Sequence, residues 1–299
     1  MRTRSNGPLA GFGWLKRGFS VSYRHPKALL GGAAILLVAC LLPSLLTLPM
    51  QFHAQLAGTP PSPATLGWIM VGSMLLGLLI VPLYAGYLQV IEAAARGLPA
   101  RALDIFKPYR QGEAWRLMGY GLAVLVVYAA ILAIIVAAAG GGIMSWYAQV
   151  LTAQASHQPP PALPDGFGIA MVLAIVLGFI MMAFYAISLG QVALRQRSVF
   201  GAIGDGMIGA LKNLLPVAVF TLSAIFASLL AVIVFAIVVV VLSLLAKLVS
   251  VWLMLVLIVP LYIASLLIMF AVMFGVMYHL WLDVCGDDNL PDMAPQITA

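Results

Sequence analysis

Positive charges in this chain gather in three short segments, and pairs of long apolar runs separate these segments. The N-terminal segment holds six Lys and Arg residues, the segment over 96–116 holds five, and the segment over 195–212 holds three; Lys247 is the exception. The chain is 64% hydrophobic and 8% charged, whereas a soluble domain is about one quarter charged. A bilayer can solvate this much apolar surface and water cannot, so the pattern predicts an all-α polytopic membrane protein.

Six apolar runs are long enough to cross a bilayer, because a span needs about 20 apolar residues for about 30 Å of hydrocarbon. The runs cover residues 28–49, 66–90, 117–139, 168–193, 214–244 and 251–281. Little more than Lys247 and Ser250 separates the last two. They must still be two spans, since one helix of about 68 residues would be about 100 Å long. We expect a single six-span membrane domain over residues 1–299.

The basic segments also set the orientation. All three lie on one side of a six-span arrangement, and positive charge is retained on the cytoplasmic side. Both termini are therefore predicted to be cytoplasmic, and the loops 50–65 and 140–167, which contain no Lys or Arg, to be outside. The second loop has room for a short surface helix. The net charge of +6 indicates attraction to anionic lipid headgroups. It does not indicate nucleic-acid binding, because the cations are spread over three membrane-proximal stretches.

Short strings recur along the chain and suggest a repeat. Residues 79–84, Leu-Ile-Val-Pro-Leu-Tyr, recur at 257–262 with an offset of 178. Phe12, Gly18 and Arg24 match Phe200, Gly206 and Lys212 with an offset of 188. We assign the ten-residue difference to a shorter outside loop in the last hairpin. Three tandem units are predicted, near 10–95, 100–196 and 200–285, each an amphipathic segment followed by a two-span hairpin, before an acidic tail at 286–299. Chance recurrence in an apolar chain is the alternative.

The segments that precede the odd-numbered spans combine aromatic rings with cations. Phe12, Trp14, Phe19 and Tyr23 interleave with basic residues, and the stretch 100–116 is similar. Such a helix lies in the interface with its rings at the acyl boundary, and Pro26 should separate it from the first span. The candidate headgroup contacts are Lys16, Arg17, Arg24, Lys107, Arg110 and Arg116. Topological anchoring alone would also explain these residues.

Reactive groups are sparse. The histidines lack the i, i+4 spacing of a helical metal site, and Cys40, within a span, is too far from Cys285 in the tail to form a disulfide. The cores of the spans contain no Asp, Glu, Lys or Arg, which argues against an ion-coupled pump. We expect no metal and no cofactor. The only plausible cytoplasmic catalytic set is His25, Glu92 and Asp283.

Weakly polar residues remain inside the spans, and they can join helices by hydrogen bonds of about 1 kcal/mol or line a cavity. The candidates are Tyr84, Tyr87, Gln89, Tyr185, Tyr262 and Ser265. Pro82 and Pro260 occupy the same place in the recurring string and should kink their helices. The kinks can act as hinges or as static bends.

Several helix-entry patterns resemble a known group of proteins. The string 13–19, Gly-Trp-Leu-Lys-Arg-Gly-Phe, ends at His25-Pro26, and a turn runs from Glu92 to Gly-Leu-Pro at 97–99. The stretch 198–201 leads to Leu-Lys-Asn-Leu-Leu-Pro at 211–216, and 278–283 closes the last span. These features resemble polytopic inner-membrane proteins of proteobacteria, the BPSS-type membrane family and more distantly YciC-like proteins. The resemblance implies a bacterial inner-membrane location; it brings no substrate and no site residue.

Three functions are compatible with this sequence. The first is a non-catalytic membrane protein that organises the envelope or contacts lipids. The second is a transporter or channel for a lipid or a small amphipathic solute, built from parallel hairpins with paired proline kinks. The third is a lipid-modifying enzyme, which requires His25, Glu92 and Asp283 to meet.

Overall fold

The structure, a computed structural model, describes residues 3–57, 62–138, 142–156, 158–249 and 251–286, and every regular element in these ranges is a helix. Six helices are long and apolar enough to cross a membrane. They agree within a few residues with the predicted runs, which confirms an all-α chain with six candidate spans. The helices that contain them are α2 (Pro26–Ala57), α3 (Pro63–Ala95), α5 (Ala114–Ala138), α7 (Phe167–Arg195), α9 (Leu214–Val249) and α10 (Val251–Cys285).

A short helical segment precedes each pair of spans. These segments are α1 (Ala10–Arg24), the 3-10 helix η1 (Ala102–Phe106) with α4 (Lys107–Arg110), and α8 (Val199–Lys212). A further helix, α6 (Gly142–Ala155), lies between α5 and α7, in the loop where the sequence leaves room for a surface helix. The described order is therefore a short segment and two long helices, three times over.

Local sequence explains several of the boundaries. Pro26 is the first residue of α2, where its missing amide hydrogen costs nothing, and α1 ends at Arg24 just before it. Ser62 caps α3 by accepting a hydrogen bond of 3.2 Å from the Thr65 amide. Beyond the end of α3, Gly97 adopts a φ of 69°, a conformation that costs glycine little.

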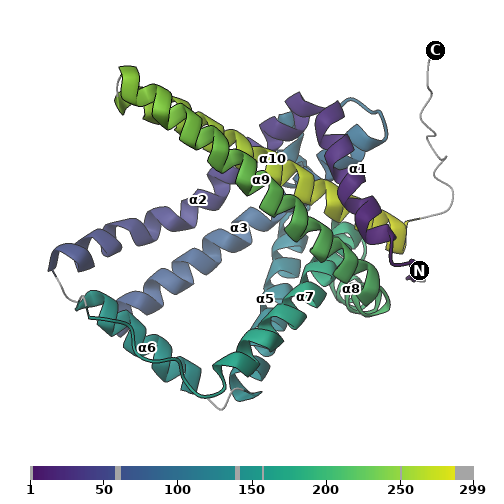
Figure 1. Ribbon diagram of the computed structural model, residues 1–299. Coiled ribbons are helices and arrows are strands. Elements are labelled where there is room, and N and C mark those ends of the chain that lie inside the picture. Colours follow the sequence, from purple (N-terminus) through teal and green to yellow (C-terminus); the bar gives the residue numbers. More distant parts are fainter. Residues whose placement is uncertain (1–2, 58–61, 139–141, 157, 250, 287–299) are drawn as a thin grey trace.

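The three hairpins α2–α3, α5–α7 and α9–α10 converge at one end and diverge at the other (Figure 1). Figure 1 shows α1 and α8 at the convergent end, which we call the packed end. Apart from Ala170, the buried residues of the described spans lie in the half nearest this end. On the first helix of each hairpin, the last buried residues along the sequence are Ala39 of α2, Val124 of α5 and Thr221 of α9. On the second helix, apart from Ala170, the first buried residues are Ile80 of α3, Met181 of α7 and Ala271 of α10.

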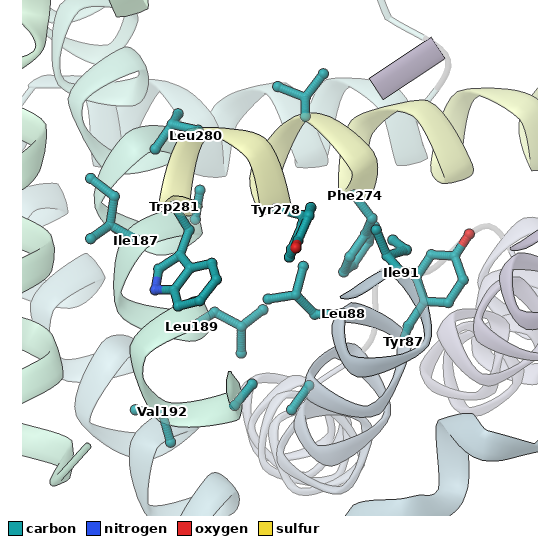
Figure 2. Packing of buried hydrophobic residues seen from close by; sticks show 14 of the residues in the cluster. Tyr87, Leu88, Ile91, Ile187, Leu189, Val192, Phe274, Tyr278, Leu280 and Trp281 are labelled. Atoms are coloured by element: carbon teal, nitrogen blue, oxygen red, sulfur yellow. The ribbon is translucent and has the colours of Figure 1, made fainter. Parts of the chain in front are cut away.

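Aromatic and aliphatic side chains pack together at the centre of the packed end (Figure 2). Tyr87 of α3 meets Phe274 of α10 edge to face, with 5.0 Å between ring centroids. Trp281 of α10 is fully buried; a Cβ added to Gly190 of α7 would lie 2.3 Å from the indole, so only glycine allows this approach. Within lipid, such packing replaces the hydrophobic effect as the force that holds helices together.

The short segments form a closed ring of contacts around the packed end. The segment η1 packs on α3, α8 packs on α7, and α1, from the start of the chain, packs on α10 at its end. Small residues mark each crossing. A Cβ added to Gly86 of α3 would lie 1.9 Å from the Ile105 carbonyl oxygen, and one on Gly18 of α1 would lie 2.9 Å from that of Val272. On α8, a Cβ added to Gly206 would lie 2.8 Å from the Cβ of Ser188. Small side chains thus permit close backbone approach.

Both ends of the described chain lie at the packed end. The Arg4 amide donates a 2.9 Å hydrogen bond to the Val284 carbonyl, and the Arg4 guanidinium donates one of 2.7 Å to Gly286. This arrangement agrees with an even number of crossings and with termini on the same side of the membrane.

The recurring strings predict that the last hairpin is ten residues shorter than the first, but the helix boundaries show no such difference. The starts of α2 and α9 are 188 residues apart, and the ends of α3 and α10 are 190 apart. The string 79–84 lies where burial begins on α3, whereas 257–262 lies in the outer half of α10. Accordingly Pro82 is buried and Pro260 is exposed. The two prolines therefore do not occupy corresponding depths, because the longer helices of the last hairpin compensate for its shorter connection.

Candidate functional site

Two of the predicted headgroup contacts bind other parts of the protein. Arg17 of α1 donates from both terminal nitrogens to the two carboxylate oxygens of Asp283 on α10, one of them at 3.0 Å. The indole nitrogen of Trp14 donates to the same carboxylate at 2.8 Å. Three charge-assisted hydrogen bonds thus fasten α1 to the last turn of α10.

Arg116 is the second such residue, and it joins α5 to α7. Its guanidinium lies 3.3 Å from Glu113 and donates 3.2 Å hydrogen bonds to the carbonyls of Val192 and Arg197. The Gln196 amide in turn donates to Glu113 at 2.6 Å. Most of the donors of Arg116 are therefore engaged within the protein and are not available to a lipid.

The other predicted headgroup contacts face outward. Lys16, Arg24 and Arg110 are exposed, and Lys107 is half-buried 3.8 Å from Asp104. Lys27, at the start of α2, is also exposed.

The outward face of α1 is apolar as well as basic. Leu9, Phe12, Lys16, Phe19 and Tyr23 recur every three to four residues and are exposed, from 49% for Phe19 to 88% for Tyr23 among the apolar members. Recurrence at this spacing places them on one side of the helix. We call this set the α1 outer face. The opposite side, with Trp14 and Gly18, is buried against α10 and α9.

The other short segments leave similar residues uncovered. Phe200 of α8 is 84% exposed, and Trp115 at the start of α5 is 82% exposed. Large rings and cations therefore surround the packed end, which is the composition of a membrane–water interface.

Four tyrosines gather where the hairpins begin to diverge. Tyr185 of α7 is close enough to interact electrostatically with Tyr84 on α3 and with Tyr120 and Tyr128 on α5. We call these four residues the tyrosine cluster. The Tyr120 hydroxyl is 2.7 Å from that of Ser188, and its ring stacks on Tyr185 with 6.5 Å between centroids. The Tyr84 hydroxyl is 3.2 Å from the Cys40 sulfur.

The depth of this cluster follows from helix geometry. Tyr84 lies twelve residues from Arg96, and Tyr128 lies twelve from Arg116; each interval is about 18 Å at 1.5 Å per residue. Tyr84 and Tyr128 thus lie well inside a hydrocarbon layer of about 30 Å, where polar groups need partners.

The remaining polar candidates have different surroundings. The Tyr87 hydroxyl donates to the Leu29 carbonyl at 2.9 Å, and the Gln89 amide donates to the Ala193 carbonyl at 3.0 Å, so both join helices. The Ser265 hydroxyl donates to the Leu261 carbonyl in its own helix, and Tyr262 is 55% exposed on the outer half of α10. The structure therefore brings Tyr84 and Tyr185 together but leaves Tyr262 on the surface.

An apolar groove adjoins the tyrosine cluster. It consists of two neighbouring pockets of ≈ 250 and ≈ 390 Å³ between α7, α9 and α10, which share Met182, Phe220 and Met273. We call it the α9 groove. Tyr128 and Tyr185 line its inner end, and Thr221 and Ser228 line its outer part. The rest of the lining consists of apolar residues and glycine: Gly178, Phe179, Met181, Ala186, Ala224, Ile225, Leu229, Val232, Val276, Met277 and Leu280.

The proposed catalytic set is not assembled by any described contact. Glu92 pairs with Arg96 one turn along the same helix, Asp283 pairs with Arg17, and His25 is exposed between α1 and α2. Among the described residues there is no cluster of three metal-ligating side chains. The acidic tail beyond Gly286 lies outside the described residues.

Sequence reasoning missed several of the residues that organise this region. The sequence predicts Trp14 to be an interfacial ring, yet it is fully buried. No sequence pattern distinguishes Tyr120 or Thr221 from the other polar residues of the spans. The spacing of Trp14 with Leu15, Gly18 and Ser22 on one side of α1 is the signal that could have identified the buried face.

The helices and their apolar surfaces define a multi-pass membrane protein with six candidate spans. No family model matches the chain, and neither a curated protein nor a solved structure matches it. The packed end, the tyrosine cluster and the α9 groove are therefore the features of the molecule that bear on its function.

Proposed function

We propose that this protein is a non-enzymatic protein of the bacterial inner membrane that organises the lipids around it. Its packed end faces the cytoplasm, because the three basic segments lie there and positive charge is retained on that side. The resemblance to the BPSS-type membrane family supports the same membrane. In this arrangement both termini are cytoplasmic.

One observation carries the proposal, namely the α1 outer face. Its exposed rings flank Lys16, and Arg24 and Lys27 follow at the end of the helix. A helix of this composition lies with its rings at the acyl boundary and its cations at anionic headgroups. Each cation near an anionic surface contributes about 1 kcal/mol to the attraction.

The hairpins extend this lipid contact into the bilayer. No residue of the most apolar window of α9 is buried by the protein, so lipid chains must cover much of the surface of this part of the helix. Lipid between diverging hairpins would be held at both its headgroup and its chains.

The same geometry supports a threefold repeat. Three units, near 10–95, 100–196 and 200–285, would each contribute a short segment that packs on the second span of another unit, in a closed ring. The offset of 188 to 190 residues between the first and last units supports this relation, whereas the string at 79–84 and 257–262 does not contribute to it.

The lipid proposal is tested by removing the exposed cations on and just after the α1 outer face. A variant with Lys16, Arg24 and Lys27 all replaced by Gln removes three exposed cations, and we expect the anionic lipid that copurifies with the protein to fall severalfold. The matched control exchanges Lys and Arg at the same positions and keeps the charge. Quantitative lipid mass spectrometry measures both. Equal anionic lipid in the two variants would refute headgroup recognition.

A second candidate, transport of a lipid or small amphipathic solute, is favoured by the α9 groove beside the tyrosine cluster. Paired hinges give it no support, because Pro82 and Pro260 lie at different depths. Flippase and uptake assays with purified protein in liposomes separate it from the first proposal. If the protein only organises lipids, the rates of lipid flipping and of solute uptake should equal those of protein-free liposomes.

A further inference from the structure

A histidine, His279, lies buried between α10 and α1. Gly275, His279 and Asp283 follow one another along α10 at intervals of four residues, which places them on one side of the helix. A Cβ added to Gly275 would lie 3.0 Å from the Cα of Gly18 on α1. Asp283 accepts a 3.0 Å hydrogen bond from Arg17, also on α1. His279, between these two contacts, therefore faces α1, and it is 8% exposed.

The His279 ring has no hydrogen-bond partner in the part of the chain that the structure describes, and both of its nitrogens are shielded from solvent. A neutral imidazole has one N–H donor and one acceptor, whereas a charged one has two donors. Burial of an unpaired charge costs far more than burial of an unpaired neutral group. The docked position of α1 is therefore compatible with a neutral His279 and strongly disfavours a charged one.

The charged groups beside His279 give its protonation little support. Arg17 of α1 acts on the ring with a like charge, and Asp283 of α10 acts with the opposite charge. The Asp283 carboxylate already accepts three hydrogen bonds from Trp14 and Arg17, so its charge is largely compensated. The charged groups of α3 and α7 act instead on the neighbouring residue of α10, Tyr278; these groups are Glu92, Arg96 and Arg195.

We propose that His279 makes the docking of α1 on α10 sensitive to acid. Because both ring nitrogens are covered while α1 is docked, a proton reaches them only when α1 moves away from α10. An exposed histidine binds a proton below about pH 6.5. The open state then holds a proton that the docked state does not, and proton binding shifts the equilibrium toward the open state. Docking is thus at full strength above this pH and weakens as the pH falls below it.

The position of α1 gives this switch a consequence for lipid. The α1 outer face lies on the opposite side of the helix from the buried contact, so release of α1 in acid also moves the rings and cations that meet the lipid. This consequence depends on the lipid-contacting role proposed above. The acid-sensitive docking itself does not depend on that role.

Hydrogen–deuterium exchange of the full-length protein in nanodiscs measures the opening of α1. The exchange of its buried amides is compared at about pH 8 and about pH 5, on either side of the histidine value, after correction for the intrinsic pH dependence of exchange. We expect the equilibrium constant for opening to rise about thirtyfold in acid, because one proton binds the open state. Asp283 contributes little over this range, since an exposed aspartate binds a proton only near pH 3.9, by about that value.

Variants at two histidines separate the cause. His279→Gln keeps a polar side chain that does not titrate, and His279→Leu removes the polar group. In both, the opening constant should change by less than about threefold over the same range. His25→Gln is the matched control, because His25 is exposed at the end of α1 and binds a proton equally in both states; it should keep the thirtyfold response. Asp283→Asn should raise the opening constant at both pH values and leave their ratio unchanged.

Two results would overturn the switch. One is a wild-type opening constant that is the same at both pH values, and the other is an equal acid response in His279→Gln and the wild type. Anionic lipid retained by the same preparations is measured in parallel. An acid response of α1 with no change in that lipid counts against the lipid-contacting role of α1 and leaves the switch intact. A change in lipid without an acid response of α1 counts against His279 alone.

Discussion

Asp283 joins the two ends of the polypeptide, since it lies in the last turn of α10 and accepts three hydrogen bonds from Trp14 and Arg17 of α1. An Asp283→Asn variant keeps an acceptor for Trp14 but loses the ion pair with Arg17. Because both side chains are partly exposed, we expect a loss of about 1–2 kcal/mol in the free energy of unfolding. Denaturation of the purified protein in detergent measures it.

A double-mutant cycle checks the cause of this loss. Arg17→Gln alone should cost a similar amount, and the two changes together should cost little more than either one. Strict additivity would contradict the ion pair as the source of the effect.

Gly86, whose side chain is a single hydrogen atom, allows α3 and η1 to approach closely where they cross. A Cβ at this position would lie 1.9 Å from the Ile105 carbonyl oxygen, so Gly86→Ala must push η1 away from α3. We expect a loss of about 1–3 kcal/mol in the free energy of unfolding. Gly77 of the same helix has no atom within 4 Å of the corresponding Cβ position. Gly77→Ala should therefore be neutral or slightly stabilising, and equal melting temperatures for the two variants would contradict the crossing.

At the scale of the element, the two prolines make a second contrast. Pro82 is buried four residues before the Gly86 crossing, and Pro260 is exposed in the outer half of α10. Pro260→Ala restores a backbone hydrogen bond in lipid and should keep or raise the melting temperature. Pro82→Ala should lower the stability by about 1 kcal/mol or more, because the smaller alanine leaves a void where the buried proline ring packs. Thermal unfolding of both variants tests this contrast. A lower melting temperature for Pro260→Ala alone would contradict it.

The six spans could be predicted from the sequence because each depends on a local property, namely a run of apolar residues as long as the bilayer is thick. The short segments before the odd-numbered spans followed from rings interleaved with cations. In contrast, the sequence does not show that Arg17 also binds Asp283 of α10 or that Arg116 also binds the Val192 carbonyl of α7, because these partners are distant along the chain.

Matched strings misled the alignment of the hairpins for a related reason. Residues 79–84 and 257–262 share letters but differ in depth, and depth is fixed by where α1 and η1 cross α10 and α3. The tyrosine cluster also required the fold, since Tyr84, Tyr120 and Tyr185 come from three helices that no sequence pattern brings together.

For the whole molecule, topology is the property that the charge pattern predicts. Reporter fusions at Arg110, Arg197 and Asp288 should be active on the cytoplasmic side, because the basic segments are held there. Fusions at Pro61, Pro161 and Lys247 should report the outside. A C-terminal fusion that reports the outside, with the N-terminus inside, would require an odd number of crossings and contradict the contact between Arg4 and Gly286 at the packed end.

The divergence of the hairpins makes the outer half of the molecule sensitive to bilayer thickness. The candidate span Leu214–Leu244 has 31 residues, about 46 Å of helix, against about 30 Å of hydrocarbon. A helix longer than the bilayer accommodates by tilting, and a tilt of about 50° would match these two lengths. In a thicker bilayer the spans should become more upright and their outer ends should approach one another.

Spin labels can measure this movement in a background without the free cysteines Cys40 and Cys285. One labelled pair, Leu45→Cys with Leu244→Cys, reports the outer halves of α2 and α9; another, Leu98→Cys with Leu211→Cys, reports the packed end, and all four positions are exposed. As lipid chains lengthen, we expect the outer distance to shorten and its distribution to narrow. The packed-end distance should stay constant, because small-residue crossings and buried rings hold it. An outer distance that ignores bilayer thickness would mean that contacts within the protein, and not the surrounding lipid, set the angle between the hairpins.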